Sequence, residues 1–258
     1  MKRLALSLSA LALVAGCQTN PITGRSQLMI VTEEMTLSSS SNAYAQTLQQ
    51  ARSKGQLDGN VTTSRRISNI TNRLVAQAKL LRPESRNWQW SVHVIEDKQV
   101  NAWCMAGGKM AVYSGLLTSV KPSDDEIAQV MGHEISHALL SHTREQMSQA
   151  MATQGVLAIG SIAAGQDLSA LGDVANVAIL LPHSRLAESE ADRLGIELAA
   201  RAGYNPNAAV SLWQKMSRLG GQKPPELLST HPSDERRLAD LAALVPRMMP
   251  LYEAARVR

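Results

Sequence analysis

Five consecutive residues, His133-Glu134-Ile135-Ser136-His137, have the side chains of a metal-dependent hydrolase. Residues four apart share one face of a helix, so His133 and His137 can hold a Zn²⁺ ion from the same side. Glu134 lies about 100° round the helix, from where its carboxylate reaches a water at the metal without being a ligand. The pattern predicts a zinc-dependent peptidase with Glu134 as a catalytic group. The alternative is a solvated helix with scattered histidines.

The flanking residues favour a buried helix for this motif. Ser123 and Glu126 fit a capping box, with Ser123 at the N-cap and Glu126 three residues later. His142 is five residues beyond His137 and points about 140° away on one continuous helix, so we exclude it as a further ligand. Buried imidazoles need partners, and a metal is one such partner. An apolar band supports burial, and it comprises Ile127, Val130, Met131, Ile135, Ala138 and Leu139.

The histidine pair needs a third ligand, because catalytic zinc sites usually have three protein ligands. A predicted helix over residues 185–200 offers Glu188 and Glu190, which point to nearly opposite sides. If Glu188 is the ligand, Asp192 lies one turn further on the same face and can accept the other N–H of a zinc-bound histidine. With Glu190 as the ligand, that place falls to Leu194, so we favour Glu188. The alternative for this cluster is a solvated acidic face.

The elements that must position these groups follow from apolar periodicity. The pattern predicts helices over 36–54, 63–81, 206–219 and 233–244, a strand over 88–95, and two short extended pieces within 99–112. The fold class is therefore α+β and mainly helical, with a small sheet beside the motif helix. We expect the edge from Asn101 to Val112 to take a peptide substrate as an added strand, and a plain hairpin is the alternative. Residues 151–181 fit either a core helix pair or a mobile lid.

The N-terminal residues predict that the protein is exported to the bacterial envelope. Lys2 and Arg3 precede an apolar run that is too short to span a bilayer, and Val14-Ala15-Gly16-Cys17 looks like a lipobox. We expect a lipoprotein signal peptide over 1–16, lipidation of Cys17, an acylated polar tether over 17–30 and a zinc metallopeptidase domain over 31–258. Gln18 after the cysteine resembles sorting to the outer membrane of Gram-negative bacteria, facing the periplasm. The alternative is an ordinary secretory signal with a chance cysteine.

The charge and cysteine content of the sequence limit the binding partners and disulfide bonds that we expect. The formal net charge is +4 and the sequence pI is about 9.2, and processing would remove the charges of Lys2 and Arg3. Because no basic stripe with interleaved aromatic residues occurs, we do not expect nucleic-acid binding. Only Cys17 and Cys104 are present. Once Cys17 is acylated, Cys104 has no disulfide partner and is expected to be a small buried apolar residue.

Several separated motifs carry a resemblance to a known family. They are His133-Glu134-x-x-His137, then Ser184-Arg185-x-x-Glu188-x-Glu190-Ala191-Asp192-x-x-Gly195, then His231-Pro232-Ser233-x-x-x-Arg237. Together with Asn20-Pro21-x-Thr23-Gly24-Arg25, they resemble the lipoprotein envelope zinc metallopeptidases of the BepA and LoiP type, in the superfamily of HtpX and the CaaX prenyl proteases. Trp103-Cys104 departs from many relatives, which affects the expected shape of the pocket.

The resemblance implies a gluzincin-type peptidase that hydrolyses misfolded envelope proteins in outer-membrane quality control. It implies zinc on His133, His137 and Glu188, with Glu134 as the general base. It also implies that His231 caps the zinc at rest or stabilises the oxyanion, whereas a structural loop histidine is the alternative. Arg237 is expected to pair with an acidic group that holds this loop. The alternative function is a zinc-stabilised, chaperone-like assembly factor with little proteolysis.

Overall fold

Helices make up most of the protein in the computed structural model, which describes residues 17–163, 182–219, 226–231 and 235–257. This confirms the predicted α+β, mainly helical fold with a small sheet. In chain order the elements are β1 (Cys17–Thr19), β2 (Ser26–Leu28), α2 (Glu33–Ser53), α3 (Val61–Leu81), the 3-10 helix η1 (Pro83–Asn87), β3 (Ser91–Ile95), β4 (Ala102–Met105), β5 (Lys109–Tyr113), α4 (Ser114–Val120), α5 (Asp124–Leu139), α6 (His142–Ala163), α8 (Arg185–Arg201), α9 (Asn207–Ser217), α10 (Glu226–Thr230) and α11 (Glu235–Arg256).

The three-stranded sheet has the order β3-β5-β4, with β3 parallel and β4 antiparallel to β5. The predicted strand over 88–95 begins only at Ser91, because its partner β5 begins at Lys109, directly after the Gly107-Gly108 turn. The expected substrate edge from Asn101 to Val112 is corrected in part. Its second half is β5, the central strand, so only β4 offers an edge.

Side-chain caps set where the first long helices begin. The Thr32 hydroxyl accepts from the backbone N–H of Met35, which starts α2 three residues before the apolar pattern predicted. Asn60 caps α3 in the same way through the N–H of Thr63. At the C-terminal end, α11 runs to Arg256 in spite of Pro246 and Pro250, which is twelve residues beyond the predicted end.

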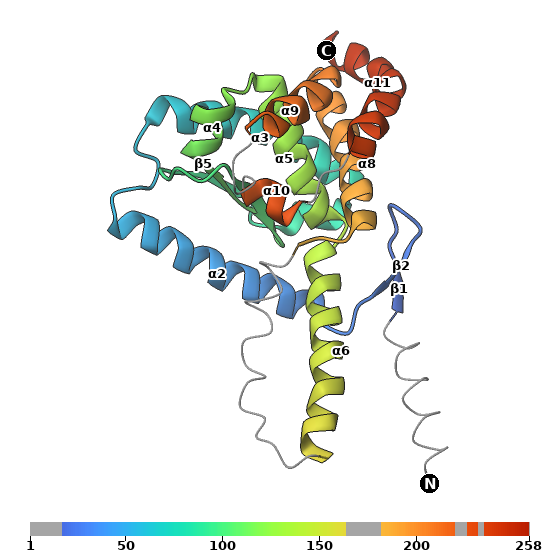
Figure 1. The fold of residues 1–258 in the computed structure, drawn as a ribbon. Coiled ribbons are helices and arrows are strands. Elements are labelled where there is room, and N and C mark those ends of the chain that lie inside the picture. The colour runs from blue at the N-terminus through green and yellow to red at the C-terminus, as the bar shows by residue number, and fades with distance from the viewer. Residues whose placement is uncertain (1–16, 164–181, 220–225, 232–234, 258) are drawn as a thin grey trace.

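The motif helix α5 lies at the centre of the molecule and is buried along almost its whole length (Figure 1). The predicted capping box is present, since the Ser123 hydroxyl accepts from the N–H of Glu126 and the Glu126 carboxylate accepts from the N–H of Ser123. Cys104 on β4 is buried, as predicted, and burial raises the pKa of its thiol well above the usual value.

Two glycines let α5 and α8 cross at close range. A Cβ atom at Gly132 would lie 2.8 Å from the carbonyl oxygen of Gly195, and a Cβ atom at Gly195 would lie 2.8 Å from the backbone nitrogen of His133. Neither separation is possible for a real Cβ, so only glycine fits at both positions. This crossing brings the acidic face of α8 against the histidine face of α5.

The segment that we expected to be a polar tether contains an ordered hairpin. Strands β1 and β2 pair antiparallel, from Cys17 opposite Leu28 to Thr19 opposite Ser26. The side chains of Asn20 and Gln27 are buried, and each donates to the carbonyl oxygen of Leu140 at 3.0 Å. Residues 17–28 therefore pack on the C-terminal end of α5 and do not form a loose linker. Lipidation of Cys17 stays a prediction.

Helix α6 projects from the body beside the N-terminal end of α2 (Figure 1). It begins at His142 and extends to Ala163 as one helix, which covers the first part of the predicted lid or helix pair over 151–181. Residues 164–181 lie outside the described residues, so the choice between lid and core stays open. Among the described helices, none is both long enough and apolar enough to cross a bilayer.

Candidate metal centre

Four buried side chains from three parts of the chain converge on one point. His133 and His137 come from α5, Glu188 from the first turn of α8, and His231 from the residue after α10. One ligand atom of each lies within 4.8 Å of the others, and all four residues are buried. The structure thus brings together the three predicted ligands and the predicted fourth group.

The distances within the cluster fit a tetrahedral ion. His133 Nε2 lies 3.0 Å from His137 Nε2 and 3.4 Å from Glu188 Oε2, and His137 Nε2 lies 3.4 Å from Glu188 Oε1. A tetrahedral zinc ion with metal–ligand distances of about 2.0–2.1 Å needs ligand atoms about 3.3–3.4 Å apart. Two imidazoles and a carboxylate are also donors that zinc prefers. The residues therefore fit a metal ion.

His231 occupies the fourth side of this cluster. Its Nδ1 lies 3.2 Å from His133 Nε2 and 2.9 Å from Glu188 Oε1. Its Nε2 lies 3.4 Å from Glu134 Oε1, an oxygen that is buried and makes no hydrogen bond within the described residues. His231 thus stands between the predicted general base and the ligand atoms.

Asp192 and Arg237 support the cluster from behind. Asp192 Oδ1 lies 3.0 Å from His133 Nδ1, the ring nitrogen that faces away from the other ligands. Arg237 forms two bonds of 2.8 Å to the Asp192 carboxylate, and its Nη1 lies 3.0 Å from Glu188 Oε2. The guanidinium also lies over the Trp213 ring, 3.6 Å from its centroid. The acidic partner of Arg237 that the sequence left unnamed is thus Asp192, with Glu188 beside it.

The buried charges shift one another's pKa values. Burial disfavours a charged His133, but hydrogen bonds to Asp192 and Glu188 outweigh it and raise the pKa of His133 to about 9. Burial lowers the pKa of His137 well below its usual value. Burial likewise opposes ionisation of Glu188, but the bonds to His133 and His137 hold its pKa far below the usual range. At Glu134 burial dominates and raises the pKa of the carboxyl.

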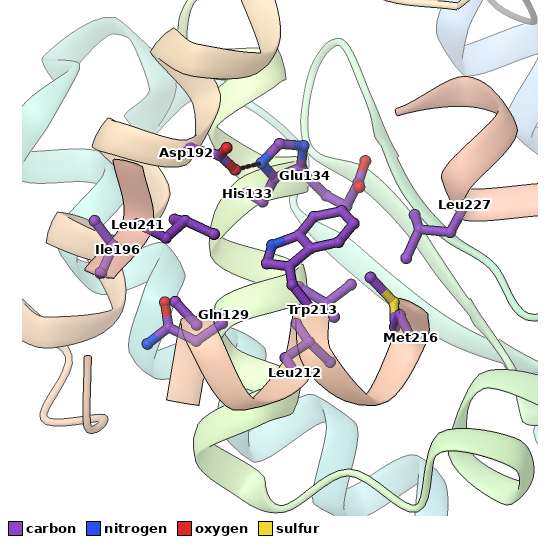
Figure 2. A pocket seen from close by; sticks show the side chains of 12 residues that line it. Gln129, His133, Glu134, Asp192, Ile196, Leu212, Trp213, Met216, Leu227 and Leu241 are labelled. Carbon is purple, nitrogen blue, oxygen red and sulfur yellow. Dashed lines mark ion pairs between the residues drawn. The ribbon is translucent and has the colours of Figure 1, made fainter. Parts of the chain in front are cut away.

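An apolar pocket opens beside His133 and Glu134. Figure 2 shows the Trp213 ring lying next to both side chains, with Met216 and Leu227 beyond it. The rest of the lining is mainly apolar and comes from α5, α8, α9 and α11, including Val130, Ile196, Ala209, Leu212 and Leu241.

Comparison with known sequences places this site in a family. The sequence pattern of "Peptidase family M48" matches residues 62–245, which contain all four residues of the cluster. The chain belongs to peptidase family M48. This confirms the predicted enzyme class, a metallopeptidase, and agrees with a bound metal at the cluster.

Relatives of this M48 chain come from bacteria and mitochondria. It is 31% identical over 246 residues to metalloprotease YcaL of Escherichia coli, covering 91% of this chain and 92% of that protein. It is 33% identical over 186 residues to the mitochondrial metalloendopeptidase OMA1 of Schizosaccharomyces pombe, covering 70% of this chain and 52% of that protein. It is 30% identical over 212 residues to a Vibrio cholerae protein named "Putative beta-barrel assembly-enhancing protease", covering 74% of this chain and 42% of that protein. The chain spans about half the length of the OMA1 protein.

Sequence reasoning missed a second layer of this M48 site. His142 is not on α5, because the chain turns at Ser141, with φ +57°, and starts α6. Its Nδ1 lies 2.9 Å from His137 Nδ1 and its Nε2 lies 3.1 Å from Glu190 Oε2. The exclusion of His142 as a ligand assumed one continuous helix; the described cluster does not include it, but it contacts a member of the cluster.

His183 was also missed. Its ring stacks on that of His137, with centroids 4.0 Å apart and planes 22° apart. Its backbone N–H donates to the carbonyl oxygen of Thr230, directly before His231. Burial, together with the nearby His231, lowers the pKa of His183 to about 3, so this ring is neutral. The only signal in the sequence was its place just before the Ser184 N-cap of α8.

Proposed function

We propose that this M48 chain is a zinc-dependent endopeptidase of the bacterial envelope that hydrolyses misfolded proteins and takes part in outer-membrane protein quality control. The convergence of His133, His137 and Glu188, with ligand atoms 3.0–3.4 Å apart, is the observation that carries the proposal. The resemblance to YcaL and to the protein named for beta-barrel assembly supports the envelope role. The lipobox-like residues ending at Cys17 support an anchor in the outer membrane on its periplasmic side.

In this proposal His133, His137 and Glu188 hold the ion, and Asp192 fixes the ring of His133 through its Nδ1–H. Zinc bound there would polarise both a water and the scissile carbonyl group. Glu134 accepts the proton of that water and passes it to the leaving amine, a role that its raised pKa suits. Arg237 holds Asp192 and Glu188 in place. His231 must move aside for substrate or stabilise the developing oxyanion.

Substrate binding along the β4 edge supports an endopeptidase over an enzyme that needs a chain end. The N–H of Tyr113 donates to the carbonyl oxygen of Asn101, so backbone groups of alternate residues of β4 face β5. Those of Ala102 and Cys104 then face the other edge, which pairs with no strand within the described residues. An extended segment from the middle of a substrate can pair there through its backbone.

Cleavage of casein by the purified chain tests the proposal. We expect hydrolysis that stops with a zinc chelator and returns when Zn²⁺ is added back, with one zinc ion bound per chain. Bound zinc without cleavage of casein or of unfolded envelope proteins would favour the assembly-factor alternative. Absence of any bound metal after zinc loading would remove the proposed function.

A further inference from the structure

The two histidines of α5 are oriented by different partners. His133 Nδ1 faces the carboxylate of Asp192, whereas His137 Nδ1 faces the Nδ1 of another histidine, His142. Metal-bound histidines usually donate their second N–H to a carboxylate, a carbonyl group or water. A histidine can take that place only if its facing nitrogen is an acceptor, which depends on what holds its other nitrogen.

Glu190 provides that constraint. If His137 binds a metal through Nε2, its Nδ1 carries the proton and donates to His142 Nδ1 at 2.9 Å. His142 then carries its own proton on Nε2 and donates to Glu190 Oε2 at 3.1 Å. Every donor in this chain of hydrogen bonds then meets an acceptor. His142 is 1% exposed, so water does not replace these partners.

Arg25 of the N-terminal hairpin holds the end of the chain. Its Nε donates to both oxygens of Glu190, at 2.9 and 3.0 Å. Its Nη1 and Nη2 donate to the two oxygens of Glu145 at 2.6 Å each, so one guanidinium fixes two carboxylates. The side chain of Arg25 is 21% exposed, against 13% for Glu190 and 11% for Glu145. Arg25 therefore fixes Glu190 across 165 residues of chain.

We infer that Arg25, Glu190 and His142 are positioning residues for His137, so that the hairpin before the family's matched region is part of the metal site. The matched region begins at residue 62, well after Arg25. This inference rests on the proposed function, because it gives His137 a metal to bind. It assigns to Glu190 a role distinct from that of Glu188, two residues away on α8.

Contacts other than those of Arg25 also hold the hairpin on the body of the protein. The role of Arg25 in positioning Glu190 can therefore be tested without detaching the hairpin. Asn20 and Gln27 bond the carbonyl oxygen of Leu140, and Gln27 Nε2 also donates to Glu145 Oε2 at 2.9 Å. None of these contacts involves the Arg25 side chain, so we expect Arg25→Ala to leave the hairpin in place and to remove the bonds that hold Glu190 and Glu145.

The test measures metal affinity by competition with a chromophoric chelator, and the visible absorption of the cobalt-substituted full chain. We expect His142→Ala to weaken zinc binding about 10- to 100-fold and Arg25→Ala to weaken it about tenfold, with a changed cobalt spectrum in both. Arg25→Lys keeps the charge but not the four bonds, and should fall between Arg25→Ala and the parent. If Arg25→Ala does not fold, Arg25→Lys carries the test. Arg201→Ala, which removes an exposed pair with Glu197 on the same helix, is the matched control and should change neither readout.

The His137→Ala variant distinguishes failure of this inference from failure of the proposed function on which it rests. Loss of zinc from His137→Ala, together with parental affinity and cobalt spectra in His142→Ala and Arg25→Ala, would overturn the positioning role alone. If His137→Ala binds zinc as tightly as the parent, the proposed metal site itself fails. A lower melting temperature of the metal-free Arg25→Ala protein, with an unchanged cobalt spectrum, would show a structural role and also overturn the inference.

Discussion

Glu134 and Glu188 are both buried in the same cluster, yet their surroundings push their pKa values in opposite directions. Burial opposes ionisation of Glu188, but hydrogen bonds to His133, His137 and His231 lower the pKa of its carboxyl and keep it ionised. Glu134 Oε1 accepts no hydrogen bond within the described residues, and burial raises the pKa of this carboxyl. A carboxylate held as an anion suits a ligand, and one that gains a proton readily suits a base. The different surroundings of the two glutamates therefore suit Glu188 to bind the metal and Glu134 to act as the base.

Glu134→Gln tests the role of the base. The amide has nearly the shape of the carboxylate but cannot accept the proton of the water, so we expect cleavage of casein to fall by at least about 100-fold. Zinc content should stay at the parental value, because Glu134 is not a ligand in the proposed site. Proteolysis at the parental rate in this variant would contradict the assignment.

His231→Ala tests the resting state of the site. Because His231 Nδ1 lies on the fourth side of the cluster, we expect zinc affinity to fall by about tenfold and the initial rate at saturating zinc to rise. The change is measured by chelator competition and by peptide hydrolysis. A slower rate at unchanged affinity would assign His231 to the oxyanion. No change in either would leave it as a structural loop residue.

Among the elements, the crossing of α5 and α8 does most to assemble the site. The sequence predicted both helices, both histidines and the Glu188 and Asp192 face, since these depend on local periodicity and on the chemistry of zinc. It did not predict that His142 starts a new helix, because the left-handed turn at Ser141 has no clear local signature. It also missed Arg25, whose partners Glu145 and Glu190 are 120 and 165 residues away.

Gly195→Ala tests the crossing. The added methyl group would lie 2.8 Å from the His133 nitrogen, so α8 must move away and take Glu188 with it. We expect a loss of about 1–3 kcal/mol in the free energy of unfolding and weaker zinc binding. Gly59→Ala is the matched control, because its Cβ meets only the Glu96 side chain, at 3.6 Å. Equal behaviour of the two variants in chemical denaturation and metal titration would contradict the close-approach argument.

Peptides with N-methyl groups test the β4 edge. The N–H of Ala102 already donates to Asn101 Oδ1, so a paired substrate would donate its own N–H groups, at alternate positions, to the outward-facing carbonyl oxygens of Ala102 and Cys104. N-methylation at those positions should raise KM by about tenfold, since each removes a backbone hydrogen bond worth about 1 kcal/mol. Methylation one residue along should change KM little. Uniform tolerance across positions would exclude strand addition as the binding mode.

At the scale of the whole molecule, Cys17→Ala tests the anchor. If the lipobox-like sequence directs acylation, the parent chain should fractionate with outer membranes and incorporate a labelled fatty acid. The variant should carry no label and should be lost from the outer-membrane fraction, while the purified protein keeps its casein activity. The hairpin bonds of Asn20 and Gln27 do not involve the cysteine side chain, so the fold should be retained. An unlabelled parent chain would leave an ordinary secretory signal.

The hairpin starts at Cys17 itself, and by Asn20 the chain is already bonded to the end of α5. If Cys17 carries a lipid, almost no flexible linker therefore separates that lipid from the folded domain. The metal site would then be held close to the bilayer surface, and we expect substrates near that surface to be cleaved first. Lengthening the chain between residues 17 and 20 would change which proteins are degraded while leaving the chemistry untouched.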